Sequence, residues 1–283
     1  MRYEDGIGVR LTVAAGGAVA LLVPAALIGA LVVGDVGWLH RFDLHVTAAG
    51  HDLAVGHPGW VRFLAVWSLI FDPNSWRAAA LVLAIWLIRR RAWPLAVWVA
   101  VTMTAGGVLG ALLKLLVGRH RPDLLDPVAR ASGYSVPSGH ALDNALGASV
   151  FLLVLLPLVR HRPRARVLLW TGAVVIPLVT GVSRVGLGVH WTSDVVAGWL
   201  LGVATTAATA WAYLTWDGRR GRRPHVATEG LQPEIADEPP PDSSPDSAPD
   251  SAPDSAPDSA KPEMSARETA REHGTGVGRP SIG

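Results

Sequence analysis

The sequence predicts an all-α membrane protein, a bundle of six transmembrane helices followed by a disordered tail. Its 283 residues are 50% hydrophobic and only 17% charged, whereas soluble domains carry about 25% charged residues. Six apolar stretches approach the roughly 20 residues that cross a bilayer as a helix. After residue 216 the apolar stretches give way to a repeat rich in Pro, Ser and Asp. We therefore expect a six-helix domain over residues 1–216 and a tail over residues 217–283.

The first apolar stretch is longer than the apolar core of a signal peptide, about 7–15 residues, which favours a retained helix over a cleaved signal. Residues 34–59 are expected to form a loop. The run 60–71 is apolar but too short to span comfortably, so we expect a re-entrant or interfacial segment there. The six spans are expected at residues 11–33, 76–88 with an extension back through Pro73, 92–117, 141–159, 167–185 and 194–216.

Arginine clusters predict the orientation of the bundle. They precede the first span and follow the second, fourth and sixth, so they lie on one side of an alternating path. By the positive-inside rule that side is cytoplasmic, which predicts a multi-pass protein of the cell (inner) membrane with both termini inside. The clusters are Arg2 with Arg10, residues 89–91, residues 160–166 and residues 219–223.

The tail carries a tetrad, P-D-S-[SA], five times between Pro241 and Ala260. Such a sequence cannot bury enough apolar surface to fold. We therefore expect a disordered cytoplasmic spacer.

Three short polar blocks stand out within the apolar part of the chain. They read K-x6-R-P from Lys114 to Pro122, P-S-G-H from Pro137 to His140, and S-R-x5-H-x3-D from Ser183 to Asp194. In an alternating bundle the ends of the third and fifth spans meet the starts of the fourth and sixth on one membrane face. The blocks are therefore expected to gather on the extracytoplasmic face, opposite the arginine clusters.

The first and third blocks contain cations suited to phosphate. A phosphoryl group in transfer spreads its charge over three oxygens and needs several fixed donors. Lys114, Arg121 and Arg184 supply them, and Arg matches phosphate oxygens bidentately. The alternative is that these side chains snorkel to the interface. A charge inside an apolar helix end is costly, which favours function for Lys114, whereas for Arg119 the two interpretations stay equally open.

The P-S-G-H block predicts the start of a helix. Ser138 is expected to cap that helix or to donate its hydroxyl to phosphate, and Gly139 lets backbone N–H groups approach an anion. His140 is then placed at the mouth of the site as the general acid.

His190 and Asp194 are four residues apart, so on a helix they share one face. Asp194 is expected to orient the imidazole of His190 and leave its other nitrogen as the nucleophile toward phosphorus. A phosphohistidine results, and His140 then activates the water that releases phosphate. His190, His140 and Asp194 are thus the expected catalytic set.

The sequence predicts neither a metal nor an organic cofactor, because the three cations supply the charge neutralisation. The absence of cysteine excludes thiolate catalysis and zinc–thiolate sites. Loop solvation or substrate gating is expected for Asp123, Asp126 and Asp143, which lack metal-ligand spacing. The histidines of the segment 34–59 are expected at the surface; they are His40, His45, His51 and His57.

The three blocks resemble those of the type 2 phosphatidic acid phosphatase and vanadium haloperoxidase superfamily, with all specified positions matched over roughly residues 60–216. Within it, the chain looks most like the bacterial membrane lipid phosphatases. The resemblance implies hydrolysis of a lipid phosphate, with the nucleophile on His190 and the general acid on His140. Three other readings stay open, namely a phosphotransferase, a vanadium haloperoxidase, which six apolar spans argue against, and a non-catalytic binding protein.

The expected partners are the bilayer and a membrane lipid phosphate, not a nucleic acid, and the sequence leaves the oligomeric state open. Undecaprenyl pyrophosphate, phosphatidic acid and phosphatidylglycerol phosphate all fit a pocket between helices, and we favour a polyprenyl pyrophosphate. The segment 34–74 is expected to cover the site.

Overall fold

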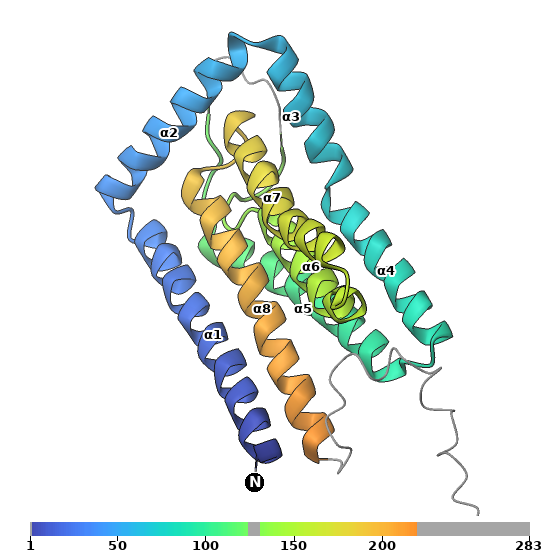
Figure 1. Ribbon diagram of the computed structural model, residues 1–283. Coiled ribbons are helices and arrows are strands. Elements are labelled where there is room, and N and C mark those ends of the chain that lie inside the picture. The colour runs from blue at the N-terminus through green and yellow to red at the C-terminus, as the bar shows by residue number, and fades with distance from the viewer. Residues whose placement is uncertain (1, 124–130, 220–283) are drawn as a thin grey trace, which may run out of the picture. The chain divides into compact units, whose positions relative to one another are not determined.

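The computed structural model describes residues 2–123 and 131–219, which are almost entirely helical and contain no strand. Figure 1 shows them as a bundle of helices. Five helices are long and apolar enough to cross a membrane, and a bent pair of helical segments, 37–55 with 58–89, makes a sixth if it counts as one span. The prediction of an all-α membrane bundle is confirmed. The repeats of the predicted tail lie outside the described residues.

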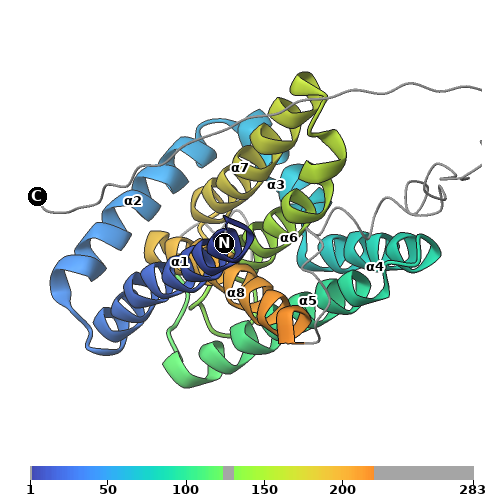
Figure 2. The same ribbon diagram turned by 60° about the horizontal axis from the view of Figure 1, so that its bottom comes forward.

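Helix α1 (Arg2–Val33) contacts helix α8 (Thr192–Arg219), and the two run side by side in Figures 1 and 2. Its apolar section, Ala14–Val33, has a mean hydropathy of 2.4. Ala18 and Ala25 are buried there, and small side chains of this kind let helices approach closely in an apolar solvent. The first predicted span is therefore a packed member of the bundle.

Residues 34–59 were expected to form a loop, and this prediction is wrong, because most of them form helix α2 (Gly37–Val55). The buried residues of α2 follow helical spacing, but three of the five are polar: Leu39, Asp43, Thr47, His51 and Ala54. A buried stripe that carries Asp, Thr and His gives no apolar periodicity, so hydrophobic periodicity could not predict this helix. His51 is accordingly buried, whereas His40, His45 and His57 are exposed as predicted.

The apolar run 60–71, expected to be re-entrant or interfacial, forms helix α3 (Pro58–Ile70), and helix α4 (Pro73–Arg89) follows it. Between them Asp72 caps α4, its Oδ1 accepting the Ser75 N–H over 2.8 Å. Figure 1 shows α3 and α4 following one another in nearly the same direction. The run 58–89 meets α2 at an angle of 113°. The second predicted span is thus α4, the C-terminal part of a longer helical run.

The other four predicted spans are confirmed to within a few residues. They are α5 (Trp93–Val117), α6 (Gly139–Leu155) with the short 3-10 helix η1 (Leu156–Val159), α7 (Pro163–Gly186) and α8. Helix α6 contacts α4, α5, α7 and α8. Its buried stripe runs through Leu142, Leu146, Val150 and Val154 at intervals of one helical turn. Helix α6 therefore forms the centre of the core.

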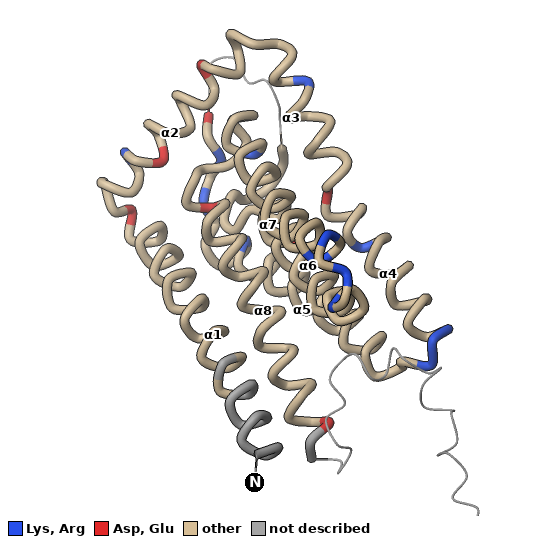
Figure 3. The backbone as a smooth tube through the Cα atoms, in the orientation of Figure 1, with Lys and Arg blue, Asp and Glu red and all other residues tan. Residues whose placement is uncertain are grey.

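Alternation of the helices gathers four of their ends. The C-terminal ends of α5 and α7 and the N-terminal ends of α6 and α8 carry the three polar blocks. The arginine clusters 89–91 and 160–166 lie at the opposite ends of these helices, where α4 leads into α5 and α6 leads into α7 (Figure 3). The separation of the blocks from these basic connections is as predicted, whereas which face is cytoplasmic stays a prediction.

Candidate active site

The structure brings the three blocks together at one end of the bundle. Lys114 lies in the last turn of α5, which ends at Gly118 in the left-handed conformation, with φ of 63°. Glycine favours this conformation because it lacks a Cβ. A Cβ placed on Gly139 would lie 3.8 Å from Nζ of Lys114, so the ammonium lies beside the first turn of α6. The cation of the first block thus meets the helix start of the second.

Ser138 is the N-cap of α6, and its hydroxyl accepts the Ala141 N–H over 3.5 Å. This confirms the prediction of a helix cap. Its own backbone N–H donates to the carbonyl oxygen of Asp194 over 3.0 Å. The first turn of an α-helix presents N–H groups without intrahelical acceptors and favours anions. The helix start and the third block therefore meet at a place suited to phosphate.

Arg184, in the last turn of α7, lies next to the end of α3. Its Nη1 donates to Oγ of Ser68 over 2.6 Å, and its buried Nε has no hydrogen-bond partner among the described residues. Arg184 is also within electrostatic range of Lys114, His140 and His190. This guanidinium therefore keeps a donor for an anion, as a phosphate-binding role requires.

Arg121 differs from the prediction, because all five of its N–H donors already have acceptors in the protein. Four of these bonds go to the backbone carbonyl groups of Ser132, Gly133, Tyr134 and Val189. The fifth goes from Nη1 to Nε2 of His190 over 3.0 Å. Arg121 thus joins the connection before α6 to the segment before α8. To hold phosphate it has to exchange an acceptor, and the ring nitrogen of His190 is the one beside the site.

His190 and Asp194 meet as predicted, although His190 lies two residues before α8 and the pair does not share a helix face. Nδ1 of His190 lies 3.3 Å from Oδ2 of Asp194, and both side chains are buried. Burial lowers the pKa of His190 to about 4, although the bond to Asp194 acts in the opposite direction. The imidazole is therefore neutral at pH 7, with Nδ1–H donating to Asp194 and the lone pair on Nε2 facing Arg121.

His140, in the first turn of α6, is half-buried and lies within electrostatic range of Arg184, His190 and Asp72. Its carbonyl oxygen accepts from Nδ2 of Asn144 over 2.8 Å, and the same Nδ2 donates to the carbonyl oxygen of Phe71 over 2.7 Å. The break between α3 and α4 therefore lies against the histidine, which supports the expectation that the segment 34–74 covers the site.

The sequence did not reveal Ser135 and Asp43 near Asp194, and it leaves the role of Arg119 open. Ser135 donates its hydroxyl to Oδ2 of Asp194, and Arg119 donates from Nη1 to Oδ1 over 2.8 Å. Arg119 also donates from Nη2 to Asp43 over 2.8 Å. Arg119 therefore neither snorkels to the interface nor faces phosphate. Asp43 lies in the polar stripe of α2, and recognising that stripe as helical was the signal that could have found it.

Of the acidic residues expected to serve loop solvation or gating, two lie in the described part of the chain. Asp143 lies on α6, buried, with Oδ2 3.6 Å from Nη2 of Arg77, so loop solvation is the wrong description for it. Asp123 is exposed in the segment after α5, and Asp126 lies outside the described residues.

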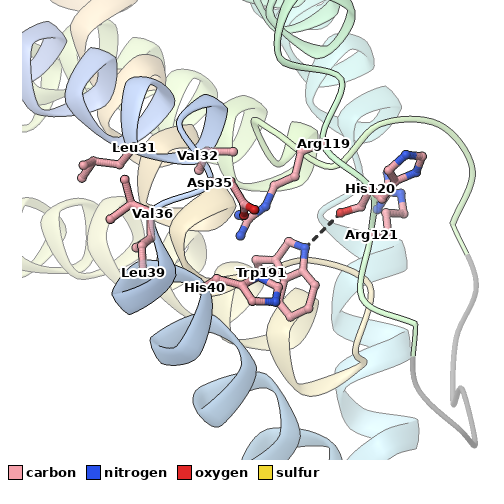
Figure 4. Close-up of a pocket in the computed structure, with 10 residues that line it drawn as sticks. All are labelled: Leu31, Val32, Asp35, Val36, Leu39, His40, Arg119, His120, Arg121 and Trp191. Atoms are coloured by element: carbon pink, nitrogen blue, oxygen red, sulfur yellow. Dashed lines mark hydrogen bonds between the residues drawn. The ribbon is translucent and has the colours of Figure 1, made fainter.

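Two cavities flank the gathered blocks. One of about 270 Å³ lies between the end of α1, the start of α2 and Arg119, His120 and Arg121. Figure 4 shows Trp191 beside it, with Nε1 donating to the carbonyl oxygen of His120 over 3.0 Å. The other, about 600 Å³, is mostly apolar, lies between α1, α5 and α8, and reaches Val136 and Pro137. An apolar volume thus borders the residues that precede Ser138.

Comparison with known proteins agrees with this arrangement. The family model of the PAP2 superfamily matches residues 91–217. An undecaprenyl-diphosphatase of Sulfolobus acidocaldarius is 34% identical over 128 residues, 43% of this chain and 56% of that protein. A phosphatidylglycerophosphatase B of Bacillus subtilis is 36% identical over 99 residues, 34% of this chain and 47% of that protein. The chain therefore spans about half the length of the curated relatives it matches.

The fold has a solved counterpart. The crystal structure of a transmembrane PAP2-type phosphatidylglycerolphosphate phosphatase from Bacillus subtilis matches with a TM-score of 0.61 at 22% identity, over 71% of this chain and 96% of that one. This likeness concerns the fold alone. The family match covers residues 91–217, from α5 to α8, and includes all three polar blocks, so this part of the chain is similar to the PAP2 superfamily.

Proposed function

We propose that the protein is an integral-membrane phosphatase that hydrolyses a lipid phosphate or diphosphate through a phosphohistidine on His190. The observation that carries the proposal is the pairing of a neutral, buried His190 with Asp194 at Nδ1 and with Arg121 at Nε2. A nucleophile oriented by a carboxylate and facing a cation is the arrangement that covalent phosphoryl transfer needs.

In the first step a phosphate oxygen replaces Nε2 of His190 as the acceptor of Nη1 of Arg121, which frees the lone pair for attack on phosphorus. Lys114, Arg184 and the N–H groups at Gly139 bind the remaining phosphate oxygens. The P–N bond forms as the bond from phosphorus to the leaving oxygen breaks, and His140 protonates that oxygen. In the second step His140 removes a proton from water, which attacks phosphorus and releases inorganic phosphate and His190.

For the substrate we favour a polyprenyl diphosphate such as undecaprenyl diphosphate, with phosphatidylglycerol phosphate or phosphatidic acid as the alternative. The undecaprenyl-diphosphatase and the phosphatidylglycerophosphatase B to which the chain is similar support one substrate each. The apolar cavity beside Val136 and Pro137 supports a lipid tail in either case. Charge neutralisation by side chains supports a metal-independent reaction, and the arginine clusters support a site outside the cytoplasm.

A phosphate-release assay on purified protein in mixed detergent–lipid micelles tests the proposal. Undecaprenyl diphosphate, phosphatidylglycerol phosphate and phosphatidic acid are compared at equal mole fraction, with His190→Ala as the matched control. We expect release from at least one lipid, the highest kcat/KM on the diphosphate, and none with His190→Ala. A higher kcat/KM on phosphatidylglycerol phosphate would replace the favoured substrate, and release by His190→Ala equal to wild type would exclude the mechanism.

A further inference from the structure

Asp194 is held from two sides. His190 contacts its Oδ2, whereas Arg119 contacts its Oδ1 over 2.8 Å and reaches Asp43 on α2 over 2.8 Å with its other terminal nitrogen. The side chains of Asp43 and Asp194 are fully buried, and that of Arg119 is 13% exposed. One guanidinium therefore joins α2 to α8 directly behind the residue that orients His190.

The position of this guanidinium is fixed by further contacts. Nη1 of Arg119 donates to Oγ of Ser193 over 2.8 Å, and the Ser193 hydroxyl and backbone N–H donate to Asp43 over 2.5 and 2.9 Å. The guanidinium carbon also lies 5.2 Å from the ring centroid of Trp191, a cation–π distance. With several partners, Arg119 can hold the plane of the Asp194 carboxylate.

The net charge of Asp43, Asp194 and Arg119 follows from their side chains. Asp43 and Asp194 contribute two negative charges and Arg119 one positive charge, so one negative charge remains. If Asp43 were absent, Arg119 would cancel the charge that Asp194 presents to His190. If Arg119 were absent, two buried carboxylates would face each other without a cation, which is strongly unfavourable.

We propose that Asp43 and Arg119 are positioning residues that act on His190 through Asp194. Arg119 fixes the Asp194 carboxylate, and Asp43 offsets the charge of Arg119 so that Asp194 keeps its own charge toward the imidazole. The inference rests on the proposed role of His190 as nucleophile. It makes α2 part of the catalytic architecture through Asp43, which contacts Arg119 and Ser193.

The test is a double-mutant cycle read in kcat and in the acid limb of kcat/KM, which follows protonation of His190. Asp43→Asn should lower kcat, about 10–100-fold as for supporting residues of other sites, without raising the acid limb. Arg119→Gln should also lower kcat and should move the acid limb upward by about one pH unit, because a cation within a few ångströms of Asp194 is lost. In the double variant the net charge is again that of wild type, so the limb should return toward the wild-type pH.

Other charged groups face His190 and Asp194 and are unchanged in every variant. They are Lys114 on α5, Arg121 in the segment after it, His140 on α6 and Arg184 on α7. Asp52→Asn on the exposed side of α2 and Arg62→Gln on the exposed side of α3 are the matched controls. Both should retain the activity and the acid limb of wild type.

Arg119→Gln leaves two buried carboxylates facing each other and can fail to fold. In that case the comparison of Asp43→Asn with the double variant carries the test. Removing Arg119 in the Asp43→Asn background should move the acid limb of kcat/KM upward, because the cation beside Asp194 is lost. If the acid limb is the same in Asp43→Asn and in the double variant, the inference is wrong. A wild-type protein without activity on any lipid would contradict the proposed function, whereas active wild type, inactive His190→Ala and unaffected pair variants would contradict this inference alone.

Discussion

The backbone N–H of Ser138 donates to the carbonyl oxygen of Asp194 over 3.0 Å. This bond ties the cap of α6, two residues before His140, to the first turn of α8. Gly198, one turn further along α8, permits the approach, since a Cβ there would lie 2.8 Å from the carbonyl oxygen of Ser138. The geometry between the two candidate catalytic histidines therefore depends on close packing of α6 against α8.

Gly198→Ala should lower both the stability and the activity of the protein. The new methyl group meets backbone rather than a flexible side chain, and overpacking of this kind costs about 1–3 kcal/mol. Thermal unfolding in detergent and kcat measure the two effects. The control is Gly172→Ala on α7, where the nearest atom to a Cβ is Cδ1 of Ile176 at 3.9 Å. Equal melting temperatures for the two variants would contradict this account of the α6–α8 contact.

Replacing His190 and replacing His140 should affect activity differently, and the difference should depend on the leaving group of the substrate. His190→Ala should abolish turnover of every substrate, since no phosphohistidine can form. His140→Ala should lose about 10²–10⁴-fold on a lipid phosphate, whose alkoxide needs a proton to leave. The nitrophenolate burst from nitrophenyl phosphate should fall far less, because this leaving group scarcely needs protonation. Only the burst is diagnostic, as His140 also acts in the second step. Equal burst losses in the two variants would mean that the roles are wrongly assigned.

The activity should survive chelation. Lys114, Arg121 and Arg184 supply the positive charge, so EDTA should leave kcat unchanged. Vanadate should inhibit, because it mimics the five-coordinate phosphorus that these donors surround. Loss of turnover in EDTA, restored by magnesium, would overturn the proposed charge neutralisation.

Cysteine labelling in intact cells tests the orientation. The chain has no cysteine of its own. Asp123 is exposed in the segment after α5 and Arg164 is exposed in the first turn of α7, at opposite ends of the bundle. Asp123→Cys should react with an impermeant thiol reagent, and Arg164→Cys should react only after the membrane is permeabilised. The reverse pattern would place the site in the cytoplasm.

The pH dependence of kcat/KM should report the buried imidazole. Burial lowers the pKa of His190 to about 4 from an ordinary value of 6.5, and the neutral form is the nucleophile. The rate should therefore persist as the pH falls from 7 to 5 and decline only near pH 4. Because a phosphate monoester itself takes up a proton near pH 6, kcat/KM is calculated for each ionic form of the substrate. An acid limb near pH 6.5 after that correction would show a solvent-exposed histidine.

The sequence by itself determined the spans and the gathering of the three blocks. A bilayer offers the backbone no hydrogen bonds, so long apolar stretches must be helices, and alternation then fixes which ends meet. The contact of His190 with Asp194 was also predicted from their spacing, although His190 lies just before α8 and not on the helix face that the prediction assumed. A functional place for Lys114 and Arg184 was predicted on a different ground, because a charge at the end of an apolar helix requires a partner.

Only the tertiary structure decided how Asp194 is held and what Arg121 contacts. Asp43 comes from a helix whose buried stripe is polar, so hydrophobic periodicity could not reveal it. Arg119 and Arg121 lie two residues apart, yet one contacts two carboxylates and the other contacts backbone carbonyls and His190. Such differences arise because hydrogen-bond partners are chosen through space, among groups that packing brings together from distant parts of the chain.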